Sequence, residues 1–141
     1  MPLAIPEIDE ILAEFAPGTR DSVVIDALGE RTVSVRMRAA GTQLRPGMAG
    51  DTVSGPSQMV LADFAVWVAV LAEVGRPGVY AVTTHLSMDF LRRPQPVDLL
   101  GECQLLKLGK RLAVGSVVLR SEGDDRPVSH ASVTYAMAPA P

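Results

Sequence analysis

An aspartate interrupts one of the most apolar stretches of the chain. Asp63 lies within MVLADFAVWVAVLAEV, residues 59–74, and no lysine, arginine or histidine occurs within four positions of it. The side chains that would share its helical face are all apolar: Met59, Val66, Trp67 and Val70. An unpaired buried carboxylate would cost several kcal/mol, so Asp63 must find partners on other elements, change its pKa or face a cavity.

Two interpretations of Asp63 stay open on this pattern. The helix could have one partly solvated edge, which Asp63 marks. Alternatively, Asp63 is a catalytic acid or base in an apolar cleft, where a raised pKa is useful. The start of the same helix supports the second interpretation, because backbone N–H groups there carry partial positive charge and can stabilise an oxyanion.

The stretch Gly55-Pro56-Ser57-Gln58 predicts where this helix begins. Glycine is accepted at the N-cap, proline is favoured at N1, and a glutamine at N3 can bond back to the cap. We therefore expect Gly55 at the N-cap, Pro56 at N1 and Gln58 at N3. Gly55 keeps a backbone N–H as a donor, whereas Pro56 has none.

The spacing of apolar residues predicts the elements that position the long helix. A short amphipathic helix begins at Pro6 and ends at Pro17-Gly18, so residues 1–20 form an N-terminal helical extension. Residues 41–55 are expected to be a loop. Strands are expected over residues 22–28, 31–39, 79–91, 98–108, 111–121 and 128–138. The order predicts one α+β domain over residues 1–141, in which an antiparallel sheet wraps the long central helix.

Composition argues against several classes of protein. Thirteen basic and sixteen acidic residues give a net charge of −3, which disfavours general nucleic-acid binding. The single Cys103 excludes an intramolecular disulfide and suits a reducing compartment, where we expect a buried, inert thiol. The sequence has no His/Cys metal spacing, Walker loop or dinucleotide fingerprint, so no metal or separate cofactor is expected.

Targeting signals are not evident in the sequence. The N-terminus lacks a basic region followed by a long apolar run, and the apolar run 59–72 is shorter than a bilayer span. We therefore expect a cytoplasmic protein that does not enter a membrane.

Several stretches together resemble the hotdog-fold acyl-CoA thioesterases of the phenylacetate-degradation (PaaI-like) family. They are SGPSQMVLAD from Ser54, AVTTHLSMDFLRRP from Ala81, LLKLGKRLAVGSVVLRSEG from Leu105 and VSHASVTYAM from Val128. The resemblance implies the hotdog fold, a long helix wrapped by a curved antiparallel sheet. It also implies that two subunits pair their sheets and form two active sites at their interface, so we expect a homodimer and a dimer of dimers.

The family pattern is His-Gly-Gly, four residues, then Leu-Ala-Asp. The resemblance makes Asp63 the general base or nucleophile of thioester hydrolysis, and Gly55 the residue whose N–H polarises the thioester carbonyl. Ser54 stands where the histidine is usual, and its hydroxyl could take the place of the imidazole. Pro56 replaces the second glycine, and Met48 occupies the position of an expected asparagine.

Polar residues alternate along 79–91: Thr83, His85, Ser87 and Asp89. Period two places them on one face, away from the helix, as a solvent face, a dimer seam or part of a site. The resemblance aligns Thr83 with a hydroxyl residue that the partner subunit donates in some relatives. We expect His85, and His130 in the last strand, to be structural.

Five basic residues follow this stretch in the sequence. Arg92 and Arg93 end one strand, and Lys107, Lys110 and Arg111 lie at the next hairpin turn. If the two ends meet, five positive charges cluster and could bind the phosphates of coenzyme A; otherwise they are solvated turns. The resemblance favours coenzyme A, because Leu-Gly-Lys-Arg-Leu-Ala matches a segment implicated in its binding.

The sequence thus favours an acyl-CoA thioesterase whose only coenzyme is the CoA of its substrate. Met59 and Trp67 are expected to line the cleft, although they could equally belong to the core. The alternative is a non-catalytic hotdog protein that binds acyl-CoA or a related thioester, motivated by Ser54, Pro56 and Met48. A hydratase is disfavoured because Asp63 has no histidine nearby in the sequence.

Overall fold

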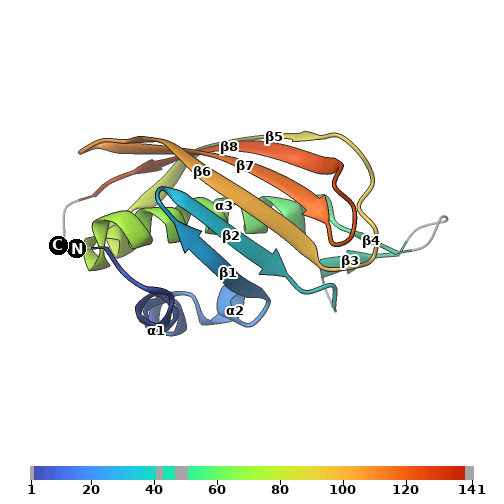
Figure 1. The fold of residues 1–141 in the computed structure, drawn as a ribbon, viewed down its shortest axis with the longest axis horizontal. Helices are drawn as coiled ribbons and strands as arrows, with labels where there is room; N and C mark the ends of the chain where they lie inside the picture. The colour runs from blue at the N-terminus through green and yellow to red at the C-terminus, as the bar shows by residue number, and fades with distance from the viewer. Residues whose placement is uncertain (1, 41–42, 47–50, 139–141) are drawn as a thin grey trace.

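A long helix wrapped by a curved antiparallel sheet confirms the predicted hotdog architecture (Figure 1). The computed structural model describes residues 2–40, 43–46 and 51–138, so Met48 lies outside the described residues. The elements in chain order are α1 (Ile5–Phe15), α2 (Pro17–Arg20), β1 (Val23–Gly29), β2 (Thr32–Met37), β3 (Leu44–Arg45), β4 (Thr52–Val53), α3 (Gly55–Val74), a 3₁₀ helix η2 (Arg76–Tyr80), β5 (Val82–Phe90), β6 (Leu99–Leu108), β7 (Leu112–Ser121) and β8 (Pro127–Ala136).

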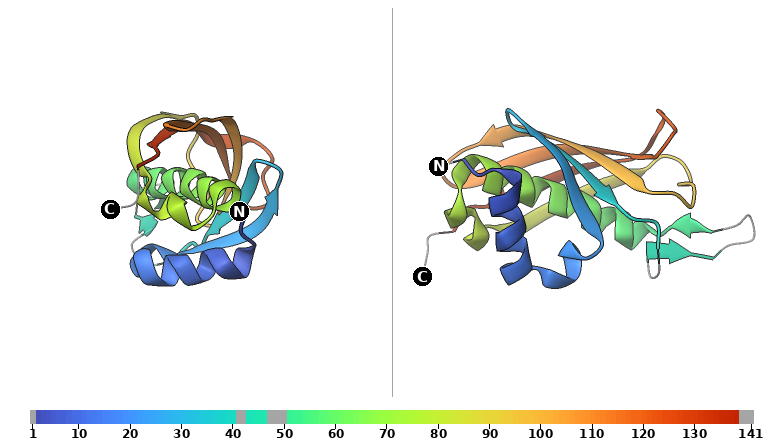
Figure 2. Two further views of the ribbon diagram at one scale, coloured as in Figure 1. Left: turned by 90° about the vertical axis from the view of Figure 1, so that its left-hand side faces the viewer. Right: turned by 60° about the horizontal axis from the view of Figure 1, so that its bottom comes forward.

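The six long strands form one sheet in the order β1-β2-β6-β7-β8-β5, with every neighbouring pair antiparallel. Alternate residues of β7 and β8 are buried, the period-two pattern of strands with one face on a core. Figure 2 (left) shows the sheet curving around α3, with α1 on the opposite side. This enclosure explains why α3 is apolar around most of its circumference.

α3 is also long and apolar enough to cross a membrane by length and composition alone. In the fold it is the core helix, and most of its apolar side chains are buried against the sheet and α1. A wrapped core helix passes the same length test as a membrane span, so this property is explained by the hotdog fold.

Besides η2, which takes residues 79 and 80 of the strand expected over 79–91, two small features were not predicted from the sequence. The expected loop 41–55 contains β3 and β4, which pair as a two-residue antiparallel ladder. The short helix α2 follows α1 directly and begins at Pro17, where the sequence predicted only an end. Elements of two to four residues are too short to produce a hydrophobic period.

A glycine allows β7 to pass close to α3. A Cβ atom added at Gly115 would lie 2.6 Å from Cγ2 of Val66, which is fully buried on the helix. Heavy atoms do not approach that closely without a shift of the backbone or of the valine. Gly115 therefore sets how tightly the sheet wraps the helix.

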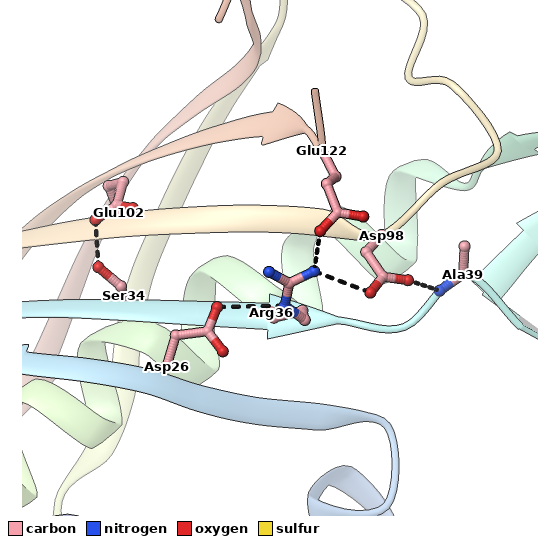
Figure 3. A network of polar contacts seen from close by, with 7 residues as sticks. All are labelled: Asp26, Ser34, Arg36, Ala39, Asp98, Glu102 and Glu122. Atoms are coloured by element: carbon pink, nitrogen blue, oxygen red, sulfur yellow. Dashed lines mark hydrogen bonds and ion pairs between the residues drawn. The ribbon is translucent and has the colours of Figure 1, made fainter. Parts of the chain in front are cut away.

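An arginine on the outer face of the sheet joins four segments (Figure 3). The Arg36 guanidinium on β2 donates to Asp26 on β1, to Asp98 before β6 and to Glu122 after β7. Asp98 also accepts the Ala39 N–H at 3.1 Å. The hydrogen bond from the Ala39 N–H, and to a smaller extent that from Arg36, holds the pKa of Asp98 below its ordinary value.

We expect Gly115→Ala to lower the free energy of unfolding by about 1–3 kcal/mol, because its methyl group overpacks against Val66. Val66→Ala in the same chain makes room for that methyl group. Urea unfolding should therefore show that the double variant loses less stability than the sum of the two single variants. Strictly additive losses would mean that the two residues do not compete for this space.

The lowered pKa of Asp98 makes its contribution to stability depend on pH. The contribution is complete above the pKa of an unfolded aspartate, about 3.9, and it is lost as pH falls through the lower folded-state value. We expect Asp98→Asn to be less stable than wild type at pH 7, with the difference shrinking in acid. Thermal unfolding from pH 2 to 7 measures this, with the exposed Asp125→Asn as control. A difference that is constant across that range would contradict the assignment.

Candidate active site

Asp63 finds its partners on the sheet. Thr83 Oγ1 donates to Asp63 Oδ1 at 2.7 Å, and the Tyr135 hydroxyl donates to the same oxygen at 3.0 Å. The Tyr135 hydroxyl also lies 3.2 Å from the Asp63 backbone carbonyl. No hydrogen bond from the described residues reaches Oδ2, so the carboxylate has one fixed oxygen and one available oxygen.

A β-bulge turns Thr83 toward the helix. β5 pairs Thr83 with Tyr135 and His85 with Thr134, so the register shifts by one residue at Thr84. Thr83 therefore shares the inward face of Tyr135, whereas His85 stays on the outer face. The prediction that Thr83 faces away from the helix is wrong for this reason. Within one chain, the Thr83 hydroxyl contacts Asp63 of that same chain, and the contribution of a partner's hydroxyl stays a prediction.

Tyr135 is the functional candidate that sequence reasoning missed. It lies on the inward face of β8, and only 5% of its surface is exposed. Burial, and then the Asp63 carboxylate, raises the pKa of Tyr135, so its hydroxyl stays protonated and donates at neutral pH. The sequence did offer one sign of this role: Tyr135 lies at an inward position of its strand, and a buried phenol needs a polar partner.

Asp63 borders a depression of about 270 Å³ between α3 and the N-terminal helices. Trp67 forms part of its wall, and its indole N–H donates to the Gly78 carbonyl at 3.1 Å, which holds the ring in place. Met59 is 41% exposed and does not line this depression. The complete lining is Ala16, Thr19, Val60, Asp63, Phe64, Trp67 and Tyr135.

The start of α3 differs from the prediction by one residue. Ser54 is the N-cap, and Gly55 and Pro56 are the first two helical residues. The Ser54 hydroxyl accepts the Ser57 N–H at 3.2 Å and donates to Ser57 Oγ at 2.9 Å. Serine is preferred over glycine at this position because its oxygen satisfies a helical N–H. The Ser54 hydroxyl is therefore occupied by the cap.

The Gly55 N–H is the donor that the helix start leaves available. Pro56 has no N–H, Ser57 donates to the Ser54 hydroxyl, and Gln58 donates to the Ser54 carbonyl at 3.1 Å. The Gly55 N–H has no acceptor among the described residues. It lies at the positive end of the α3 dipole, where a developing negative charge is stabilised.

A second depression, of about 520 Å³, lies at this helix start. Gln58 borders it and is almost fully buried; its Nε2 donates to the Val53 carbonyl rather than to the cap. Within the described chain, Gln58 Oε1 has no hydrogen-bond partner. The complete lining is Arg45, Thr52, Val53, Ser54, Gly55, Gln58, Phe90, Leu91, Arg92, Arg93 and Pro94.

Asp63 and Gly55 of one chain cannot act on the same carbonyl group. Eight residues separate them along one α-helix, which corresponds to about 12 Å at 1.5 Å per residue. They also border different depressions. A single chain thus holds the Asp63 carboxylate and the available Gly55 N–H at two separate places.

The predicted cluster of five basic residues does not form within one chain. Val82 at the start of β5 and Leu112 after the β6–β7 turn both pair with Ala136. Phe90 at the end of β5 pairs with Ser129, seven residues away along β8, or roughly 23 Å at strand spacing. Lys107, Lys110 and Arg111 therefore lie at the opposite end of the sheet from Arg92 and Arg93.

The histidines and the cysteine lie away from Asp63. His130 Nε2 is 2.8 Å from Ser116 Oγ on the outer face of the sheet, a structural contact as predicted. Cys103 is buried, and burial raises the pKa of its thiol to about 12. The described part of the chain contains no group of three or more His, Cys, Asp or Glu residues that could hold a metal ion.

Comparison with known proteins gives consistent matches. A family model described as the thioesterase superfamily matches residues 50–128. A crystallised candidate thioesterase from Silicibacter sp. TM1040 is 41% identical, with a TM-score of 0.86, over 97% of this chain and 93% of that chain. No curated protein matches the chain significantly in sequence.

More distant structures share the fold. Zebrafish thioesterase superfamily member 2 is 20% identical, with a TM-score of 0.79, over 96% of this chain and 99% of that chain. A hypothetical thioesterase from Streptococcus pneumoniae, crystallised with coenzyme A, is 16% identical, with a TM-score of 0.73, over 92% of this chain and 96% of that chain. The predicted likeness to the PaaI-like subfamily is consistent with these matches.

Proposed function

We propose that this chain, a thioester hydrolase that belongs to the thioesterase superfamily, acts on acyl-CoA thioesters through the Asp63 carboxylate. The observation that supports this most is the pair of hydroxyl groups that hold one Asp63 oxygen at the border of an apolar depression. Such an arrangement leaves the second oxygen to take a proton from water or to attack a carbonyl carbon.

Each of these two roles of Asp63, as a base or as a nucleophile, gives a route for the hydrolysis. As a general base, Asp63 removes a proton from a water molecule that attacks the thioester carbonyl, and the CoA thiolate leaves. As a nucleophile, Asp63 attacks the carbonyl carbon and displaces the CoA thiolate to form an anhydride, which water then hydrolyses to the free acid and the Asp63 carboxylate. In both routes the carbonyl oxygen becomes an oxyanion, and the Gly55 N–H is our proposed donor to it.

A second copy of the chain would bring that donor to Asp63. β5 is the last strand of the sheet, and it carries exposed apolar residues such as Val82 (57%) and Phe90 (53%). An open apolar edge of this kind is normally covered. We propose that two copies pair their β5 edges about a two-fold axis. The antiparallel arrangement then moves the Gly55 end of one α3 toward Asp63 of the other.

The same pairing gives the basic residues a shared location. Arg92 and Arg93 follow the end of β5, whereas Lys110 and Arg111 lie near its start. In antiparallel β5 edges, the start of one strand lies beside the end of the other. We propose that these residues, together with Arg45 at the helix start, contact the CoA phosphates. The related protein crystallised with coenzyme A supports a ligand of this class.

The acyl group would enter the depression beside Asp63. Its walls come from α3 and from the N-terminal helical extension, which supplies Ala16 and Thr19. Trp67 is our proposed acyl contact. Since the space is small and mostly apolar, compact acyl groups should fit it better than long chains.

Asp63→Asn should abolish CoA release without abolishing binding. We expect wild type to release thiol from at least one of a panel of short, medium, long and aromatic acyl-CoAs. The variant should lose at least about a hundredfold in kcat, with acyl-CoA affinity changed only a few-fold. Asp89→Asn, an exposed carboxylate on the outer face of β5, is the matched control and should stay active.

Two results would contradict this assignment. Retention of turnover by Asp63→Asn would remove Asp63 from the chemistry. Binding of acyl-CoA without thiol release by wild type would favour the alternative function, a non-catalytic protein that binds thioesters.

The proposed pairing predicts the mass of the protein in solution. Sedimentation equilibrium should give at least twice the 15.0 kDa chain mass. Val82→Lys places a charge at the β5 edge and should weaken the assembly and turnover together. Leu106→Lys, at an exposed leucine of β6, is the control and should do neither. A fully active monomer would exclude a site shared between copies.

A further inference from the structure

We propose that Tyr135 is a positioning residue for Asp63: its hydroxyl, with that of Thr83, fixes one carboxylate oxygen so that the other faces the reacting water or carbonyl carbon. This inference rests on the proposed function, because it assigns a role within that reaction. It concerns a residue that touches Asp63 rather than the substrate.

The two donors form one rigid unit. Thr83 and Tyr135 are opposite each other in the β5–β8 register, on the same inward face of the sheet. Their oxygens lie 2.7 and 3.0 Å from the same Asp63 oxygen. Because both donors belong to hydrogen-bonded strands, the carboxylate cannot rotate without breaking both contacts. Its orientation is therefore set by the sheet, although Asp63 itself lies on the helix.

Tyr135 suits this role because its hydroxyl remains a donor. Burial and the neighbouring negative charge of Asp63 both raise the pKa of Tyr135 and so oppose loss of its proton. A hydrogen bond to an ionised carboxylate favours the ionised form, which is the form that acts as base or nucleophile. Tyr135 therefore keeps its hydrogen bond to the Asp63 carboxylate at neutral pH.

Apart from Asp63 and Tyr135, the described residues that line the depression have no titratable side chain. α3 contributes Val60, Phe64 and Trp67 to the depression, and the N-terminal helices contribute Ala16 and Thr19. β5 contributes the neutral Thr83. Within one chain, the hydrogen bonds to the Asp63 side chain thus come from Thr83 and Tyr135.

Tyr135→Phe tests the role while keeping the buried ring. We expect kcat on the best acyl-CoA to fall about tenfold, the magnitude of one lost hydrogen bond, with KM nearly unchanged. The chain has two tyrosines, so Tyr80→Phe, at an exposed tyrosine outside the site, is the matched control. It should leave both readouts unchanged.

Fluorotyrosine provides a second test if Tyr135→Phe folds poorly. In the Tyr80→Phe background, 3-fluorotyrosine labels Tyr135 alone and strengthens its hydroxyl as a donor without changing the packing. The labelled enzyme should keep the wild-type kcat, because the fluorinated hydroxyl still donates to Asp63. The ¹⁹F resonance should shift when Asp63→Asn is introduced, because the two side chains are in contact.

The outcomes separate this inference from the proposed function. If wild type hydrolyses no thioester, the proposed function fails, whatever Tyr135 does. If wild type is active and Asp63→Asn is inactive, but Tyr135→Phe keeps the wild-type kcat, the positioning role is overturned. A loss of stability in Tyr135→Phe with unchanged kinetics would overturn it equally, because the hydroxyl would then serve the fold alone.

Discussion

The hydrogen bonds from Thr83 and Tyr135 to Asp63 reconcile an apolar core helix with a carboxylate. A hotdog helix must be apolar on most sides because the sheet encloses it, and an unpaired acid in that setting would be strongly destabilising. The sheet supplies two hydroxyl groups that donate to the Asp63 carboxylate. The same contacts orient the carboxylate beside the depression, so one interaction serves both stability and the proposed chemistry.

The length of the helix imposes the second constraint. The available N–H at Gly55 and the carboxylate at Asp63 are about 12 Å apart along α3, and no side-chain movement can bring them onto one carbonyl. The open β5 edge and the separate depressions at the two positions are consistent with one solution, an antiparallel pair of copies. Under the proposed function, catalysis and assembly are the same structural requirement.

Much of the fold was predictable from the sequence, because long helices and strands produce clear hydrophobic periods. The wrapped helix and the six long strands followed from such patterns, and so did the choice of Asp63 as a candidate. The orientation of Thr83 did not, since a single extra residue at Thr84 reverses the face of every residue before it. Tyr135 was missed because its partner lies 72 positions away in the sequence. The basic residues were grouped wrongly because neighbours along the chain lie at opposite ends of the sheet.

A crystal structure of Asp63→Asn bound to an intact acyl-CoA that the wild type hydrolyses would show whether the site is shared between copies. We expect the thioester carbonyl oxygen to lie within hydrogen-bond distance of the Gly55 N–H of one copy. The substituted side chain at position 63 of the other copy should then lie beside the carbonyl carbon or the attacking water, held by Thr83 and Tyr135. A thioester bound by one chain alone, or remote from position 63, would contradict the shared site.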